Sequence, residues 1–154
     1  MSVIEKQYVL QSFLDKDPRW TQLATELKQG LHDLGKGMPA GAIVNALQQL
    51  ANAIEKISGD AETSYRSLKE ACVPGPKEII RDEKDMVEVL LANMALLRGA
   101  LQKLTEDLTD YAKGEHPEHS LEDAEKHYND FVINWIKALG QAKALQKTYA
   151  IFAK

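Results

Sequence analysis

The chain has 154 residues, of which 44% are hydrophobic and 27% charged, and its formal net charge is -4 at pH 7. A chain of this length and composition buries enough apolar surface to fold as one domain, 1–154, so the composition excludes an intrinsically disordered protein. The acidic balance argues against a nucleic-acid partner, because binding to phosphates requires clustered Lys and Arg.

Cysteine usage and hydropathy predict a soluble cytoplasmic protein. Cys72 is the one cysteine, so no internal disulfide forms, as is usual in a reducing compartment. No apolar run approaches the roughly 20 residues that span a bilayer. The first residues, MSVIEKQYVLQSF, include the acidic Glu5 and lack the long apolar stretch of a signal peptide.

Three clusters of Gly and Pro divide the chain into four segments. They are GKGMPAG (35–41), VPGP (73–76) and KGEHPEHS (113–120), and such clusters end helices or form turns. Between them no segment alternates with a period of two, so each predicts a helix. We expect helices over about residues 2–35, 40–72, 77–113 and 120–153.

The first segment has a break in an otherwise continuous apolar stripe. One heptad register includes Leu10, Phe13, Trp20, Ala24, Leu27, Leu31 and Leu34. Asp17 interrupts this stripe, and Pro18 removes a backbone donor and disfavours a helical conformation in the residue before it. The pattern predicts a helix that is kinked or split near Pro18.

The second and third segments each predict one long helix. Apolar or small residues recur three and four positions apart at Ile43, Leu47, Leu50, Ile54, Ile57, Ala61, Ser64 and Leu68, and at Val87, Leu90, Met94, Leu97, Leu101, Leu104, Leu108 and Tyr111. The second segment keeps its phase through Gly59, although an interior Gly costs about 1 kcal/mol relative to Ala. We therefore expect a weak point there rather than a helix end.

The last segment has the clearest stripe, with alternating spacings of three and four residues. It contains Tyr128, Phe131, Trp135, Ala138, Ala142, Leu145, Tyr149 and Phe152. This spacing is typical of the coiled-coil-like packing of helices at a shallow angle. Three short connections make neighbouring helices antiparallel. The sequence therefore predicts an all-α, up-down-up-down antiparallel four-helix bundle with long helices.

Apolar residues of the last two segments also fall on the outer side of these stripes, namely Val89, Leu96, Ile133, Ile136 and, further along, Ile151. Counting from the turn near residue 117 places residues 94–101 level with 132–139, so we expect Val89, Leu96, Ile133 and Ile136 to gather on one surface. Such a surface indicates a partner interface, most simply with a second copy of the chain. Two alternatives remain: the kinked first segment covers the surface, or one or two of these residues are simply exposed.

Lysines occupy the outer face of the last helix beside this surface. They include Lys137, Lys143, Lys147 and Lys154, and no acidic residue follows Asp130. Acidic residues gather at the start of the same helix, a distribution that complements the helix dipole. An acidic protein partner or an anionic lipid surface would also meet a lysine face. A peripheral membrane interaction is therefore the alternative to a protein partner.

The turn before the last helix offers groups that can ligate a metal, namely Glu115, His116, Glu118 and His119. A surface turn lacks the outer groups that hold metal ligands in place, so a solvated polar turn is the preferred interpretation. His127 is interpreted as a surface hydrogen-bonding residue. The chain lacks the Glu-x-x-His motifs of a di-metal bundle, and we predict no metal and no other cofactor.

No set of residues in the sequence predicts an enzyme. Cys72 precedes VPGP at a helix C-terminus, where the helix dipole raises the pKa of a thiol. The chain has no Gly-x-Ser-x-Gly turn and no complete phosphate-binding loop. We therefore predict neither catalysis nor a small-molecule substrate.

The remaining prediction is a non-enzymatic interaction, adaptor or scaffold protein that self-associates through its third and fourth helices. Stable interfaces combine an apolar centre with a polar rim. We expect the centre at Val89, Leu96, Ile133 and Ile136, and the rim at Lys137, Lys143 and Lys147. Peripheral lipid binding is the first alternative, and metal binding is the second.

Overall fold

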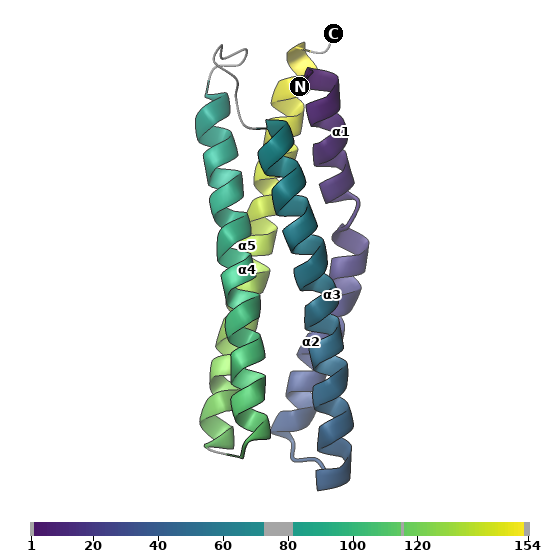
Figure 1. Ribbon diagram of the computed structural model, residues 1–154, viewed down its shortest axis with the longest axis vertical. Coiled ribbons are helices and arrows are strands. Elements are labelled where there is room, and N and C mark those ends of the chain that lie inside the picture. The colour runs from purple at the N-terminus through teal and green to yellow at the C-terminus, as the bar shows by residue number, and fades with distance from the viewer. Residues whose placement is uncertain (1, 73–81, 115, 153–154) are drawn as a thin grey trace.

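The computed structural model describes residues 2–72, 82–114 and 116–152 (Figure 1). All regular structure in these ranges is helical, in α1 (Val3–Leu14), α2 (Asp17–Gly35), α3 (Ala40–Cys72), α4 (Glu83–Ala112) and α5 (Pro117–Phe152). Helix α5 begins three residues before the predicted start at 120. The predicted break at 73–76, the helix start at 77 and the helix end at 153 lie outside the described residues. None of the described helices combines the length and the apolarity that crossing a membrane requires.

The helices form four antiparallel rods, in which α1 and α2 together make up the first rod (Figure 1). Each rod packs against two others: the first against α3 and α5, and α4 against α3 and α5. The chain runs down the first rod, up α3, down α4 and up α5, so α1 and the end of α5 lie at the same end of the bundle. The structure therefore confirms the predicted up-down-up-down four-helix bundle.

The first rod is split at Asp15 and Lys16, just before Pro18, as predicted. Pro18 lies in the first turn of α2, where a missing backbone N–H leaves no helical hydrogen bond unmade. Ser2 begins the rod as an N-cap, and its hydroxyl accepts a hydrogen bond from the Glu5 N–H at 3.2 Å.

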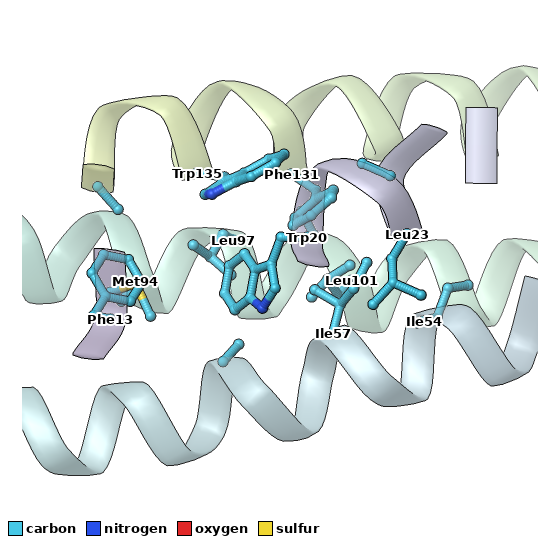
Figure 2. Packing of buried hydrophobic residues seen from close by; sticks show 14 of the residues in the cluster. Phe13, Trp20, Leu23, Ile54, Ile57, Met94, Leu97, Leu101, Phe131 and Trp135 are labelled. Carbon is cyan, nitrogen blue, oxygen red and sulfur yellow. The ribbon is translucent and has the colours of Figure 1, made fainter. Parts of the chain in front are cut away.

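An aromatic cluster around Trp20 occupies the middle of the core (Figure 2). The Trp20 ring lies 6.2 Å from that of Phe13, 6.4 Å from that of Phe131 and 5.9 Å from that of Trp135, measured between centroids. The indole N–H of Trp20 donates to Asp60 Oδ2 at 3.3 Å, so the polar atom of this buried ring has a partner on α3. The cluster thus joins α1, α2, α3 and α5.

Helix α3 extends beyond the end of α4. An ion pair between Arg98 and Glu62 sets the register of the two helices, and counting along both from this pair places Ala112, the last residue of α4, level with Gln48. The start of α3, residues 40–47, therefore lies at and beyond the end of α4 (Figure 1). This explains why Ile43 and Leu47 are only partly buried, whereas the stripe of α3 from Leu50 onward is buried.

Candidate functional site

The four apolar residues that we expect on one surface are all exposed. Relative exposure is 45% for Val89, 59% for Leu96, 49% for Ile133 and 61% for Ile136. The split first rod packs on α3 and α5 but leaves these side chains uncovered. An intramolecular cover, one of the two alternatives to a partner interface, is therefore wrong.

Contacts between α4 and α5 show how these residues are arranged. Two contacts give the alignment of these antiparallel helices: His127 with Asp107, and Tyr149 with Glu83. Counting along both helices from these contacts places Leu96 level with Lys137. Val89 lies about two turns from Leu96 along α4. Val89 lies about five turns before Asp107 at 3.6 residues per turn, on the side of α4 that faces α5. Val89 and Leu96 therefore lie along the junction of α4 and α5.

Ile133 and Ile136 lie at the centre of the outer face of α5. They are separated by about 60° around the helix axis, at 100° per residue. The line opposite the buried stripe of α5 runs between these two residues. Ile133 therefore lies on the side of α4, and Ile136 lies on the side of the first rod. The four predicted residues thus form a band across α5 and the α4–α5 junction.

Lys137, Lys143 and Lys147 are exposed on α5 beside this band. Within residues 2–72, 82–114 and 116–152, the ion pairs of the protein involve none of these three lysines. Lys154 lies outside the described residues. The three described lysines therefore leave an uncompensated positive surface next to exposed isoleucines.

A second polar feature is a buried cluster at the end of the bundle where α1 begins. Lys6 of α1 and Tyr149 of α5 both contact Glu83 Oε1, the ammonium at 2.6 Å and the hydroxyl as a hydrogen-bond donor at 2.5 Å. The ammonium also lies 5.4 Å from the centroid of the Tyr149 ring, a cation–π distance. Lys6, Glu83 and Tyr149 are almost fully buried, so one carboxylate links three helices.

This cluster joins three helices through one carboxylate. Burial, followed by the hydrogen bond to Glu83, raises the pKa of Tyr149, so its hydroxyl remains a neutral donor. Lys6 and Glu83 form a buried ion pair. The cluster therefore connects α1, α4 and α5.

Cys72 ends α3 beside this cluster and is fully buried. Burial raises the pKa of its thiol to about 11, with the Lys6 ammonium opposing and Glu83 adding to the shift. The pKa of the thiol is raised, as predicted, but the main cause is burial rather than the helix dipole. Since the thiolate is the nucleophile, the structure leaves this cysteine inert.

We predict that Cys72 is not alkylated in the folded protein. Iodoacetamide at neutral pH should leave the native chain unmodified by mass spectrometry, because the thiol is both buried and protonated. The same treatment in denaturing urea should modify it completely. Native labelling as fast as that of the unfolded chain would contradict this placement.

His127 pairs with Asp107 across the α4–α5 junction. The Nδ1–Oδ2 distance is 2.5 Å, and both side chains are largely buried. The interpretation of His127 as a surface hydrogen-bonding residue therefore missed both its partner and its burial. Burial raises the pKa of the Asp107 carboxyl, although the hydrogen bond and charge of His127 oppose this shift. The pair marks the register of the two helices.

The histidine-containing turn places its side chains in solvent. His116 and His119 are exposed, and His119 Nε2 lies 3.8 Å from Asp123 Oδ2 on the next turn of α5. Glu115 lies outside the described residues. Among the residues that the structure describes, no group of three or more His, Cys, Asp or Glu is placed to hold a metal ion.

An apolar groove of about 720 Å³ lies between the start of α3 and the end of α4. It is lined by Ile43, Val44, Leu47, Leu108 and Tyr111 among others, and it arises where α3 extends beyond α4. The sequence pattern does not predict this groove. The apolar stripe of α3 includes Ile43 and Leu47, which suggests that both residues are buried against a neighbouring helix.

The buried Lys6–Glu83 pair also escaped the sequence analysis, although a signal was present. Lys6 lies four residues before Leu10 and Glu83 four residues before Val87, so each occupies a stripe position of its helix. Opposite charges at the ends of two apolar stripes predict a buried ion pair when topology brings those ends together.

No known protein family, curated protein or solved structure matches this chain.

Proposed function

We propose that the protein is a non-enzymatic interaction protein that docks a second copy of itself through the outer faces of α5 and α4. The observation that carries this proposal is the exposure of Ile133 and Ile136, at 49% and 61%, in the middle of α5. Both side chains belong to a helix whose opposite face already supplies the core. About half of this apolar surface is therefore left uncovered in a single chain.

The surroundings of the two isoleucines support an interface. Leu96 and Val89 widen the apolar surface toward α4, and Lys137, Lys143 and Lys147 border it with charge. A buried apolar centre with a charged rim is the usual composition of a specific protein interface. Docking of this kind requires no cofactor. A cytoplasmic location is the matching proposal, since the cysteine is unpaired.

The expected effect of Ile133→Glu/Ile136→Glu is a change from dimer to monomer. Two carboxylates at the centre of the interface would be buried without partners, which is costly. Light scattering behind size-exclusion chromatography should give about twice the chain mass for the wild type and one chain mass for the variant. Circular dichroism should show equal helicity, because both positions are exposed within one chain.

Val44→Glu is the matched control. Val44 is also a β-branched residue, is 69% exposed and lies in the groove between α3 and α4, at the end of the bundle where α5 begins and away from Ile133 and Ile136. We expect this variant to remain dimeric. A monomeric Val44→Glu together with a dimeric Ile133→Glu/Ile136→Glu would move the interface to the groove and contradict the proposal.

Peripheral membrane binding is the second candidate, favoured by the adjacency of exposed lysines and isoleucines on α5. Anionic lipid attracts basic faces, and the attraction falls with salt. Co-sedimentation of the wild type with phosphatidylserine vesicles, lost in Ile133→Glu/Ile136→Glu, would support this candidate. Equal sedimentation with neutral and anionic vesicles would remove the role of the lysines.

A further inference from the structure

Helix α5 has a second stripe, on the face opposite the core, and every residue in it is exposed. Successive members are three or four residues apart: Glu118, Glu122, Glu125, Asn129, Ile133, Ile136, Gly140, Lys143, Lys147 and Ile151. This is the spacing of a helix face that packs against another helix. The stripe covers about 50 Å of helix at 1.5 Å per residue.

The chemistry of this outer stripe changes in order along the helix. Its first third carries Glu118, Glu122 and Glu125 with one lysine, Lys126, at its edge. Its middle carries Asn129, Ile133, Ile136 and Gly140, and its last third carries Lys143, Lys147 and Ile151. A two-fold axis that is perpendicular to α5 and passes between Ile133 and Ile136 would place the outer stripe of a second copy against this one, running in the opposite direction. Glu122 then lies level with Lys147 of the second copy and Ile133 with its Ile136, and Glu125 lies within one residue of the level of its Lys143.

The helix dipole explains only part of this charge order. Its effect falls off within the first and last turn of a helix, and α5 runs from Pro117 to Phe152. Glu118 lies in the first turn, but Glu125 and Lys143 each lie more than two turns from the nearer end. The helix dipole does not account for charges so far inside the helix, and a facing stripe of opposite order would match them.

Gly140 is compatible with this arrangement, although Gly59 in α3 and Gly99 in α4 are equally free of neighbours. An interior Gly destabilises a helix by about 1 kcal/mol relative to Ala, yet a Cβ at this exposed position would meet nothing of its own chain within 4 Å. Packing inside one chain therefore does not require a glycine there. In the two-fold arrangement Gly140 faces Asn129 of the second copy, where a missing side chain lets the two helices approach closely.

We propose that two copies of the chain pack α5 against α5 in antiparallel orientation, with the acidic third of each outer stripe against the basic third of the other. This inference rests on the proposed function and adds the orientation, the register and the specificity-determining residues. An isologous contact of this kind closes on itself, so it yields a dimer and not a filament. Glu122, Glu125, Lys143 and Lys147 select the antiparallel register, because a parallel pair would place like charges together.

Charge reversal tests the arrangement. The acid-reversed variant is Glu122→Lys/Glu125→Lys, and the base-reversed variant is Lys143→Glu/Lys147→Glu. Each turns four attractive contacts of the antiparallel dimer into repulsive ones, so sedimentation equilibrium at low salt should show a dimer Kd raised about tenfold or more. An equimolar mixture should form a heterodimer with a Kd at or below that of the wild type. High salt should reduce these differences.

The matched control is Lys28→Glu/Lys36→Glu, which reverses two exposed lysines of the first rod and should leave the dimer Kd unchanged. A wild-type dimer that Ile133→Glu/Ile136→Glu splits but neither charge reversal weakens would overturn the antiparallel register and leave the proposed docking face intact. A wild-type chain that is monomeric at every concentration would overturn both proposals. Binding of that monomer to phosphatidylserine vesicles would then identify lipid as the occupant.

Discussion

Replacing Lys6 by methionine should lower the free energy of unfolding by about 3–5 kcal/mol, the usual loss when one partner of a buried ion pair is removed. Lys6 and Glu83 have side-chain exposures of 6% and 1%. Methionine fills the space of the lysine side chain but carries no charge. The Glu83 carboxylate then keeps the hydrogen bond from the Tyr149 hydroxyl and loses its cation. The carboxylate must then be buried as an unbalanced charge or take up a proton.

A second change distinguishes charge balance from packing. In Lys6→Met/Glu83→Gln both members are neutral, and the glutamine carbonyl can still accept the hydrogen bond of Tyr149. We therefore expect the double variant to be more stable than Lys6→Met alone in urea unfolding at neutral pH. Lys28→Met, at an exposed lysine of α2, should change stability by no more than about 0.5 kcal/mol. A Lys6→Met variant as stable as this control would show that the pair does not hold the helices together.

Trp20→Ala should also lower the free energy of unfolding, by about 3–5 kcal/mol, as is usual for emptying a large buried site. The ring is 1% exposed and contacts aromatic residues of both α1 and α5. Its loss removes these contacts and the hydrogen bond to Asp60. Thermal unfolding followed by circular dichroism and urea titration measure the change.

Trp20→Phe serves as the matched control, because it keeps an aromatic ring and loses the N–H. We expect a smaller loss than for Trp20→Ala, since much of the volume is retained. If Trp20→Ala and Trp20→Phe were equally destabilising, the hydrogen bond to Asp60 and not the aromatic packing would be the main contribution of Trp20.

The architecture could be predicted because its causes are local. Spacings of three and four residues place each stripe on one helix face, and short connections leave little choice but antiparallel neighbours. Pro18 predicted the split of the first rod for the same reason, since it acts on the backbone beside it. Residues such as Leu97, Leu104 and Ala138 are fully buried, as their stripe positions require.

Contacts that depend on the exact register between helices could not be predicted, although counting from the turn near residue 117 gave the approximate alignment of α4 and α5. Whether His127 meets Asp107 depends on the alignment of these helices to within one turn. The partial exposure of Ile43 has the same origin, because it follows from α3 extending beyond α4. The pattern of a single helix does not give its height relative to another helix so closely.

The candidate interface could be located from the sequence but not interpreted fully. Val89, Leu96, Ile133 and Ile136 stood out because they lie off the stripes, and the structure leaves them exposed. The charge order along the last helix is visible in the sequence, but its match to an antiparallel second copy depends on the exposed outer stripe of α5. An interface is formed by the surfaces of two molecules, so the sequence of one chain describes only one of these surfaces.

The measurement that tests the central claim most directly is the molar mass of the wild-type protein in solution, by light scattering from low to high micromolar concentration at low salt. The chain has a mass of 17.2 kDa, and self-docking through α5 predicts a mass that rises toward twice this value and stays there. A mass of one chain throughout this range would contradict the account.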